Sequence, residues 1–355
     1  MPDNLKQLRA RIDALDLDIL RLVSERASAA HAIGKLKGDG TVYRPEREAQ
    51  VLRRLAQNNP GPLPDTVVMH LFTEVISACR ALEDAFSVAS LGPRGTFSEE
   101  AAIKHFGSQA PVVLCNSIDE VFRSVESDSV GYGMVPLENS TEGAVGRTLD
   151  LLLSSPLKMC GEVLLPVHQN LLSKGRDVSA VARIYSHAQS LAQCNRWLSQ
   201  NCPRAERVPV ASNAEAAKRA QDDPESAAIA GRSAAGHYGL SVLAGNIEDE
   251  PNNTTRFVVI SRQDVAPSGN DKTSLVMSTR NVSGAIHELL TPLAKNGVSM
   301  TRLESRPSRT GLWEYVFFLD MEGHQNDDNV ARALEEMREI AAFLKILGSY
   351  PVAVQ

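Results

Sequence analysis

The feature that most constrains the fold is an apolar stripe near the N-terminus that no proline interrupts before Pro45. Its residues recur at a 3-4-3-4 spacing, which places them on one face of a helix. They are Leu5, Leu8, Ile12, Leu15, Ile19 and Leu22. A helix from about Asn4 to Lys37 would be about 50 Å long, longer than a small domain is wide. The stripe therefore needs a partner, most simply a second copy of the chain.

The size and charge of the chain narrow the classes of function. A length of 355 residues predicts two or three domains. The net charge of -6 argues against nucleic acids and anionic membranes as partners, so an anionic ligand would need a local basic pocket. The five cysteines form no CxxC pair, which predicts reduced thiols without a zinc site. With a charged N-terminus and no long apolar run, we expect a cytoplasmic protein.

Basic residues on the long helix lie too far apart to share one small ligand. Arg9 and Arg26 are separated by about 25 Å along the axis. In an antiparallel dimer, Arg9 of one protomer reaches the pocket that Arg26 and Lys37 form on the other. A solvated charged face on a dimerisation helix would give the same spacing. Two further helices are predicted, from Arg47 to about Asn58 and from an N-cap at Asp65 to about Phe86.

The amino-acid sequence of this segment resembles the all-helical class of chorismate mutases over residues 5 to 84. The stretches LRARIDALDLDILRLVSERASAAHAIGKLK and YRPEREAQVL carry the resemblance. It implies that Arg9 of the partner chain, Arg26 and Arg47 bind the two carboxylates of chorismate, and that Glu48 binds the ring hydroxyl. It also implies that Lys37 and Glu83 hold the ether oxygen. These residue types suit a unimolecular rearrangement. Such a reaction needs the substrate held in a compact conformer and the charge that develops on the ether oxygen stabilised.

Two positions depart from this family's pattern. Many relatives have Gln where this chain has Glu83, and a carboxylate beside a developing oxyanion repels it unless protonated. We therefore expect mutase activity to fall as Glu83 loses its proton. Cys79 stands where some relatives have Ser; it either contacts chorismate or is a buried helix thiol.

The central segment alternates short apolar runs with helical stretches, which predicts an α/β region of two wound lobes. Ligands then bind at strand ends and helix starts. Three such junctions carry polar residues: GPRGTFS at 92–98, VPLENSTEG at 135–143 and YSHAQ at 185–189. The first is not a nucleotide loop, since it matches neither GxGxxG nor GxxxxGK[ST]. Taken singly, each junction also fits an ordinary N-cap or turn.

Together with TTRF at 254–257, these junctions resemble the prephenate dehydratase family over about residues 88 to 261. The resemblance implies two lobes like those of periplasmic amino-acid-binding proteins, with the site in the cleft. Thr255 would be catalytic, donating a hydrogen bond to the departing hydroxyl with help from Glu138. The remaining residues implied to hold substrate are Asn139, Ser140, Ser186, Gln193 and Arg256. His187 is either a general acid or a structural hydrogen bonder.

The C-terminal segment follows a linker at 266–270 and has the order βαββαβ, which is typical of a ferredoxin-like fold. It resembles the ACT regulatory domain of prephenate dehydratases. The matching phenylalanine-binding positions are Gly284, Ala285, Ile286, Glu304, Ser305, Arg306 and Pro307. The resemblance implies that L-phenylalanine binds between two such domains and inhibits the enzyme. A dimerisation domain without a ligand is the alternative.

Together, the patterns and resemblances predict a multidomain chain: an all-α chorismate mutase domain at 1–86, an α/β dehydratase domain at 87–265 and an α+β ACT domain at 272–351. The expected enzyme converts chorismate to prephenate, and prephenate to phenylpyruvate with loss of water and CO2. We expect no cofactor or metal, a homodimer or higher homo-oligomer, and L-phenylalanine as allosteric inhibitor. A non-catalytic amino-acid sensor is the alternative; a dehydrogenase fusion would need a nicotinamide fingerprint, which the sequence lacks.

Overall fold

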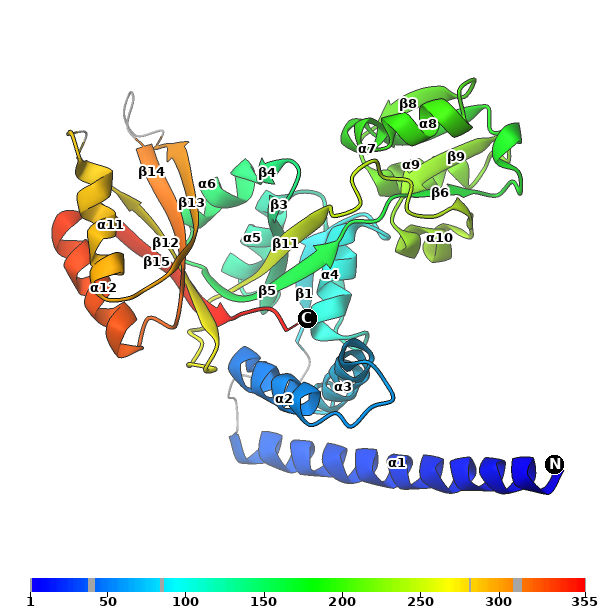
Figure 1. Cartoon of the computed structure of the whole chain (residues 1–355), viewed down its shortest axis with the longest axis horizontal. Coiled ribbons are helices and arrows are strands. Elements are labelled where there is room, and N and C mark those ends of the chain that lie inside the picture. Colours follow the sequence, from blue (N-terminus) through cyan, green and yellow to red (C-terminus); the bar gives the residue numbers. More distant parts are fainter. Residues whose placement is uncertain (1, 38–41, 84–85, 281, 309–314, 355) are drawn as a thin grey trace.

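The computed structural model describes residues 2–37, 42–83, 86–280, 282–308 and 315–354. In these residues the chain forms three N-terminal helices, two α/β lobes and a C-terminal α+β unit (Figure 1). The multidomain architecture predicted from the sequence is confirmed in its three classes. No described helix combines the length and apolarity that a membrane crossing requires.

The long N-terminal helix is present as predicted: α1 (Pro2–Lys37) has 36 residues. It lies beside α3 (Asp65–Arg80), while its N-terminal half extends away from the rest of the molecule (Figure 1). The apolar stripe is solvent-exposed in the single chain, with 53% of Leu5 and 58% of Ile19 accessible. The stripe therefore has no covering element within the described part of the chain.

The two shorter helices differ at their ends from the sequence expectation. Helix α2 (Pro45–Gln57) starts at Pro45, whose fixed φ suits the first helical turn, and not at Arg47. Helix α3 has Pro64 at its N-cap position, and Asp65 is its first helical residue. It ends at Arg80 and not near Phe86.

The first lobe is built on a sheet of order β2-β1-β3-β11-β5, with β4 paired to β3. Its strands are β1 (Val88–Leu91), β2 (Val112–Cys115), β3 (Tyr132–Asn139), β4 (Gly143–Ala144), β5 (Lys158–Pro166) and β11 (Thr254–Ser261). Its helices are α4 (Phe97–Phe106), α5 (Ile118–Glu126) and α6 (Gly146–Ser154). Strand β11 returns from the second lobe and lies antiparallel between β3 and β5. An interior strand of this sheet thus comes from late in the sequence.

The second lobe has a sheet of order β10-β6-β9-β7-β8 and hydrophobic cores of its own. Its strands are β6 (Asn170–Ser173), β7 (Arg183–His187), β8 (Glu206–Val210), β9 (Ser226–Ala230) and β10 (Ser241–Ala244). Its helices are a 3-10 turn (Val178–Ala180), α7 (Ala188–Gln193), α8 (Asn195–Asn201), α9 (Asn213–Ala220) and α10 (Arg232–Tyr238). The chain crosses between the lobes twice, after β5 and before β11 (Figure 1).

The C-terminal unit has the predicted ferredoxin-like arrangement. Its elements are β12 (Asp271–Ser278), α11 (Ala285–Lys295), β13 (Met300–Pro307), β14 (Tyr315–Glu322), α12 (Asp328–Ile340) and β15 (Phe343–Pro351). The sheet order is β13-β14-β12-β15, with all neighbours antiparallel. Both helices pack together against one face of the sheet.

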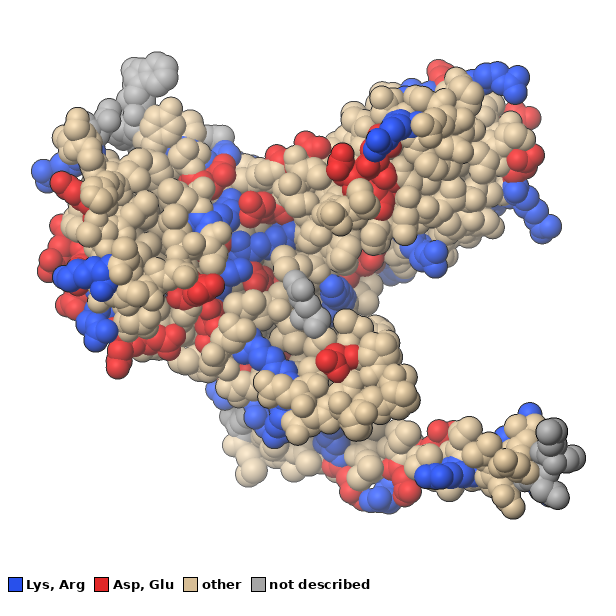
Figure 2. Space-filling view, in the orientation of Figure 1, with Lys and Arg blue, Asp and Glu red and all other residues tan. Residues whose placement is uncertain are grey.

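The C-terminal unit is joined to the first lobe by a continuous hydrophobic core. Val276, Phe318 and Tyr350 belong to the same buried cluster as Leu149 and Met159. The segment predicted as a linker is also held in place, because Arg53 of α2 donates to the backbone carbonyl of Asn270 at 2.7 Å. Figure 2 shows acidic and basic side chains interspersed over the visible face, without a broad basic surface.

Candidate active sites and effector site

The cleft between the two lobes collects most of the polar junctions seen in the sequence. A cavity of about 360 Å³ lies there, and residues from both lobes line it. The N-terminus of α4 reaches it through Thr96 and Ser98, and the N-terminus of α9 through Ser212 and Asn213. Both helices therefore point the positive ends of their dipoles at the cleft, which favours an anion.

Thr255 is held in the wall of this cleft by an amide. The side-chain nitrogen of Asn139 donates to the Thr255 hydroxyl at 2.8 Å and to the Asn253 side-chain oxygen at 2.7 Å. The Asn139 oxygen accepts from the backbone N–H groups of Thr141 and Glu142. Accepting this bond does not engage the Thr255 proton, and no described residue accepts it, so the proton is available for donation.

Glu138 and Arg256 are not part of the cleft, which corrects the sequence expectation. Arg256 pairs with Glu138 across the β11–β3 ladder, one position beyond the Thr255–Asn139 pair. Neighbouring residues of a strand point to opposite faces. Both side chains consequently point away from Thr255 and toward the C-terminal unit.

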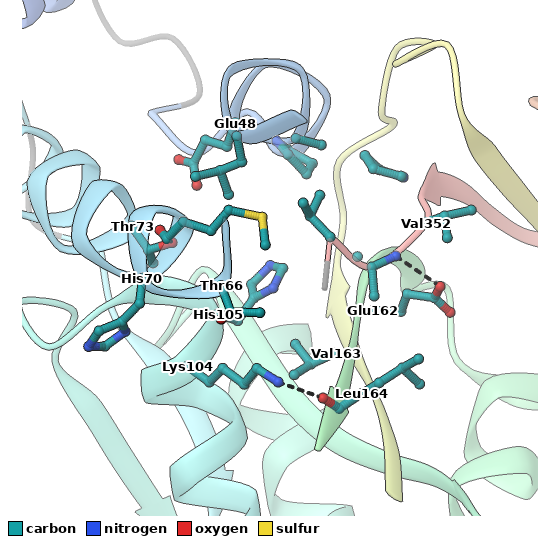
Figure 3. A pocket seen from close by; sticks show the side chains of 18 of the residues that line it. Glu48, Thr66, His70, Thr73, Lys104, His105, Glu162, Val163, Leu164 and Val352 are labelled. Atoms are coloured by element: carbon teal, nitrogen blue, oxygen red, sulfur yellow. Dashed lines mark hydrogen bonds between the residues drawn. The ribbon is translucent and has the colours of Figure 1, made fainter. Parts of the chain in front are cut away.

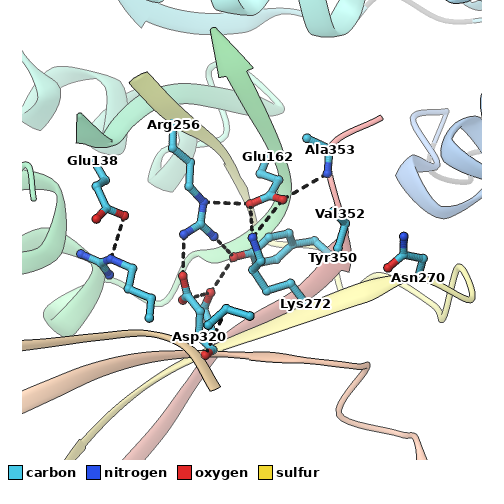
Figure 4. Close-up of polar contacts among 12 residues, drawn as sticks. Glu138, Glu162, Arg256, Asn270, Lys272, Asp320, Tyr350, Val352 and Ala353 are labelled. Atoms are coloured by element: carbon cyan, nitrogen blue, oxygen red, sulfur yellow. Dashed lines mark hydrogen bonds and ion pairs between the residues drawn. The ribbon is translucent and has the colours of Figure 1, made fainter. Parts of the chain in front are cut away.

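The face opposite the cleft carries a buried charge network (Figure 4). The Arg256 guanidinium donates to Glu162 at 2.8 Å, to Asp320 at 2.5 Å and to the Tyr350 hydroxyl at 2.8 Å. Lys272 adds a second cation to Glu162 at 3.0 Å. With its guanidinium used in this way, Arg256 cannot also hold a substrate carboxylate in the cleft.

Glu138 makes an ion pair with the buried Arg302 of β13. Arg302 Nε lies 2.9 Å from Glu138 Oε2, although the orientation is not that of a hydrogen bond. The contact belongs to the junction with the C-terminal unit (Figure 4). It leaves Glu138 without the predicted role beside the Thr255 hydroxyl.

Two predicted substrate-binding serines are structural in this conformation. Ser186 is fully buried, and its hydroxyl shares its one proton between Asn213 Oδ1 and the carbonyl oxygen of Ile229, both at 2.9 Å. Ser140 accepts from the backbone N–H of Thr254 at 2.9 Å. Neither serine lines the cavity. Ser186 instead bonds to Asn213, which does line the cavity, and Ser140 bonds to Thr254, the residue before Thr255.

Gln193 and His187 both lie in the cleft wall. The Gln193 amide is 3.4 Å from the Thr141 hydroxyl and accepts from Asn253 at 3.4 Å, so it connects the second lobe to the first. His187 caps α7 by accepting from the backbone N–H of Gln189 through Nδ1. In the neutral ring the proton then resides on Nε2.

Several cleft residues were not singled out in the sequence. Asn213, Gln169 and Ser190 form a hydrogen-bonded group in the wall, with the Asn213 amide donating to Ser190 at 2.9 Å. Asn213 lies within an S-x-x-E capping pattern that begins at Ser212. This pattern is the only feature of the sequence that points to Asn213. The expectation of a basic pocket is wrong for this cleft, because the described residues that line it include neither lysine nor arginine.

Three residues of the expected mutase site, Arg26, Cys79 and Glu83, lie where α1 meets α3. Arg26 donates to the Cys79 thiol at 3.0 Å, and Glu83 packs so closely on α1 that a Cβ at Gly34 would lie 3.0 Å from its Cγ. Cys79 is buried and bonded to Arg26, which fits both a contact with chorismate and a structural helix thiol. Arg9 and Arg47 are exposed. The side chain of Lys37 lies outside the described residues.

Glu48 is held by Arg80, a residue that the sequence analysis did not identify. The Arg80 guanidinium donates to Glu48 Oε1 at 2.6 Å. Burial raises the pKa of Glu48, although Arg80 and Arg26 act against that shift. A cavity of about 230 Å³ adjoins Glu48, bounded by α2, α3, α4, β5 and the last residues of the chain (Figure 3).

The residues of the expected effector site are only partly together in one chain. Gly284, Ala285 and Ile286 line a cavity of about 840 Å³ at the start of α11. Gly284 has φ of 82°, a conformation that favours glycine. The residues 304–307 lie on β13 and do not line that cavity. Arg306 instead pairs with Asp150 of α6 at 3.1 Å.

The described residues contain no group of three side chains suited to hold a metal ion. The fold and the cleft define a multidomain enzyme with a helical unit, a two-lobed α/β unit with a polar cleft between its lobes, and an ACT-type unit. Three family models match in this order: chorismate mutase type II over residues 8–84, prephenate dehydratase over 88–265 and the ACT domain over 273–339.

Relatives match nearly the whole chain. A bifunctional chorismate mutase/prephenate dehydratase from Neisseria gonorrhoeae is 55% identical, over 98% of this chain and 96% of its own length. One from Pseudomonas aeruginosa is 51% identical, over 99% of both chains. A prephenate dehydratase from Arthrobacter aurescens, solved in complex with L-Phe, has a TM-score of 0.70 and 36% identity, and covers 75% of this chain and 90% of that one.

The chain belongs to the family of bifunctional chorismate mutase/prephenate dehydratases. It has both activities, and it is an enzyme of phenylalanine biosynthesis. The alternative of a non-catalytic sensor is thereby set aside.

Proposed function

We propose that the two activities occupy separate sites of different construction, within domains at 1–86, 87–265 and 272–351. Chorismate is rearranged in a site shared by two protomers in a homodimer, and prephenate is converted in the cleft of a single protomer. L-phenylalanine acts as an allosteric inhibitor through the C-terminal domain. The observation that supports this most directly is the Thr255 hydroxyl, held by Asn139 with its proton free to be donated into the cleft.

For the mutase, the proposal assigns carboxylate binding to Arg26 and Arg47 of one protomer and Arg9 of its partner. The exposed stripe of α1 supports a second copy as the partner, because about half of each apolar side chain is otherwise in water. Glu48 binds the ring hydroxyl, while Lys37 and Glu83 contact the ether oxygen. Binding the compact conformer and stabilising charge on that oxygen are what a unimolecular rearrangement requires.

For the dehydratase, Thr255 donates a hydrogen bond to the departing ring hydroxyl. Loss of hydroxide and CO2 leaves an aromatic ring, so the protein needs to supply a donor and hold the carboxylates. The starts of α4 and α9 favour these carboxylates, since neither lysine nor arginine lines the described cleft. Asn139 orients Thr255, Gln193 bridges the lobes around the substrate, and Ser140 and Ser186 position the neighbouring residues.

Regulation by phenylalanine is supported by the junction behind Thr255. Arg256, the next residue of β11, is bonded to Asp320 of β14 and Tyr350 of β15. A change in the C-terminal sheet is therefore transmitted to the strand that carries Thr255. The complex of the Arthrobacter aurescens dehydratase with L-Phe is a further point in favour. Residues 284–286 and 304–307 bind the effector once two C-terminal domains meet.

The experiment that tests the proposal follows conversion of chorismate to phenylpyruvate by the purified full-length chain, with and without L-phenylalanine. We expect phenylpyruvate to form and its formation to slow when the amino acid is added. Equilibrium dialysis with labelled phenylalanine measures the effector site separately. Turnover that is unchanged by phenylalanine, together with no binding of phenylalanine at millimolar concentration, would refute the proposed regulation. The proposed catalytic roles would not be affected.

A further inference from the structure

The contact between the mutase helices and the dehydratase domain centres on Arg80, the last residue of α3. Its side chain is 4% exposed. One terminal nitrogen donates to Glu48 Oε1 at 2.6 Å, and the other donates to the backbone carbonyl of Phe106. Phe106 is the last residue of α4, so this guanidinium bonds to both a mutase side chain and a dehydratase helix end.

The cation is enclosed by aromatic rings from both domains. The guanidinium carbon lies 4.6 Å from the ring centroid of Phe86, 5.5 Å from that of Tyr43 and 5.6 Å from that of Phe106. Such contacts stabilise a desolvated cation and fix its plane. The carbonyl at the C-terminus of α4 adds the negative end of a helix dipole. Arg80 is therefore held by the end of α4 as well as by Glu48.

Docking of α4 on α3 is tight at the next residue. Gly107 has φ of 75°, and a Cβ there would lie 2.4 Å from the Cβ of Ser77 on α3. The two helices thus meet without room for a side chain. This close approach sets the distance from the Phe106 carbonyl to Arg80.

Glu48 would have room to move without that anchor. The cavity of about 230 Å³ adjoins it on the side of β5 and the C-terminal segment (Figure 3). His105 also lines this cavity, but burial lowers its pKa to about 3, with Arg80 contributing to the shift, so its ring is neutral. Arg80 is the cation that bonds directly to the carboxylate among the described residues. Its bond occupies Oε1 and leaves Oε2 for a ligand.

We propose that Arg80 is a positioning residue of the mutase reaction: it holds Glu48 in the orientation that receives the ring hydroxyl of chorismate, and the dehydratase helix α4 holds Arg80. This inference rests on the proposed role of Glu48. It gives the fusion of the two domains a physical purpose, since part of the mutase site is set by the neighbouring domain.

The test is a double-mutant cycle on the full-length enzyme, with variants Arg80→Met, Glu48→Gln and both together. Methionine keeps the packing stem in the aromatic enclosure and removes the cation. We expect Arg80→Met to lower mutase kcat/KM about tenfold or more, because a misplaced substrate-binding group costs that much. In the Glu48→Gln background the same change should cost little further. Equal losses in both backgrounds would overturn the inference.

Rescue and fold controls separate positioning from support of the fold. Arg80→Lys keeps a cation beside Glu48 and should recover more mutase activity than Arg80→Met; recovery by methionine instead would count against the inference. Arg53→Gln is the matched control, because Arg53 also ties α2 to the rest of the chain through carbonyls but does not touch Glu48. We expect it to leave mutase kcat/KM unchanged.

Dehydratase turnover on added prephenate reports the integrity of each variant. It should persist in Arg80→Met, and its loss together with the mutase would indicate a structural role and overturn the inference. A Glu48→Gln variant with full mutase activity would instead refute the proposed role of Glu48 itself. A slow Glu48→Gln enzyme beside a fully active Arg80→Met enzyme would refute only the positioning role.

Discussion

The mutase helices and the dehydratase cleft differ in how much of a site one chain completes. In the cleft, Thr255, Asn139 and Gln193 come from three elements of two lobes and are hydrogen-bonded within a single chain. On the helices, the N-terminal half of α1 extends away from α2 and α3 (Figure 1), and Arg9 belongs to that half. A sheet brings distant residues together by strand pairing, whereas a straight helix keeps its own residues apart.

The two regions also differ in how they treat anions. The mutase helices present arginines at Arg9, Arg26 and Arg47, while the described lining of the cleft has no cation. In place of arginines, the starts of α4 and α9 and several amide side chains line the cleft, together with the Glu142 carboxylate.

The largest expected effect separates the two sites directly. Thr255→Ala should lower dehydratase kcat by about 10²–10³-fold, the usual cost of removing a positioned donor to developing charge. Mutase activity should remain, because Thr255 lies in the cleft and not on the helices. Separate assays on chorismate and on prephenate check this. A folded variant that has lost both activities would break the comparison.

The second prediction tests whether the mutase site is shared. Arg9→Ala and Arg26→Ala should each lower mutase kcat/KM by about 100-fold, since each removes a charged clamp on a carboxylate. Mixing the two variants under exchange conditions should restore about a quarter of the wild-type activity, because half the dimers are mixed and each contains one intact site. No recovery on mixing would place both arginines in the same protomer's site.

A third prediction concerns the junction behind the cleft and gives a pH dependence. Burial opposes ionisation of Asp320, but Arg256 and the Ser274 hydroxyl outweigh it and lower its pKa. A lowered folded pKa stabilises the protein above the unfolded value, about 3.9, and this contribution is lost as pH falls through the folded value. Asp320→Asn should therefore cost about 3 kcal/mol at neutral pH and progressively less below about pH 4.

Urea unfolding of both proteins over a pH series measures this difference. Ser274→Ala is the milder companion, because it removes one hydrogen bond to Asp320 and keeps the ion pair. A pH-independent difference between wild type and Asp320→Asn would show that the carboxylate charge does not support the junction. Mutase activity should be insensitive to either change, which extends the contrast between the regions.

The smallest effect is expected at Glu83. If the Glu83 carboxylate lies beside the ether oxygen, Glu83→Gln should flatten the pH–rate profile of the mutase. Activity on chorismate measured from acidic to alkaline pH compares the two proteins. An identical profile in the variant would remove Glu83 from the chemistry. The dehydratase profile serves as the internal control.

Much of the fold followed from patterns that act over short distances. The 3-4-3-4 spacing predicted α1 because helix periodicity is local, and the βαββαβ order predicted the C-terminal sheet. Arg256 was assigned wrongly to the cleft, although strand alternation offered a warning. Thr255 and Arg256 are adjacent, and the side chains of successive residues in a strand point to opposite faces of the sheet.

Other features had no counterpart in the sequence. Nothing in the sequence of α3 pointed to Arg80, since its partners Glu48 and Phe106 lie 32 and 26 residues from it along the chain. The same holds for Gln169 and Ser190, whose bond depends on how β6 and α7 meet.

By itself, the sequence determined the three classes of domain and the overlong first helix with its apolar stripe, and it nominated the residues proposed to carry chemistry. The tertiary structure alone decided which face each of those residues occupies. It moved Arg256 and Glu138 to the junction with the C-terminal unit, and it placed Arg80 between Glu48 and α4. The physical reason is that periodicity is set by neighbouring residues, whereas the orientation of a buried polar group is set by partners from elsewhere in the chain.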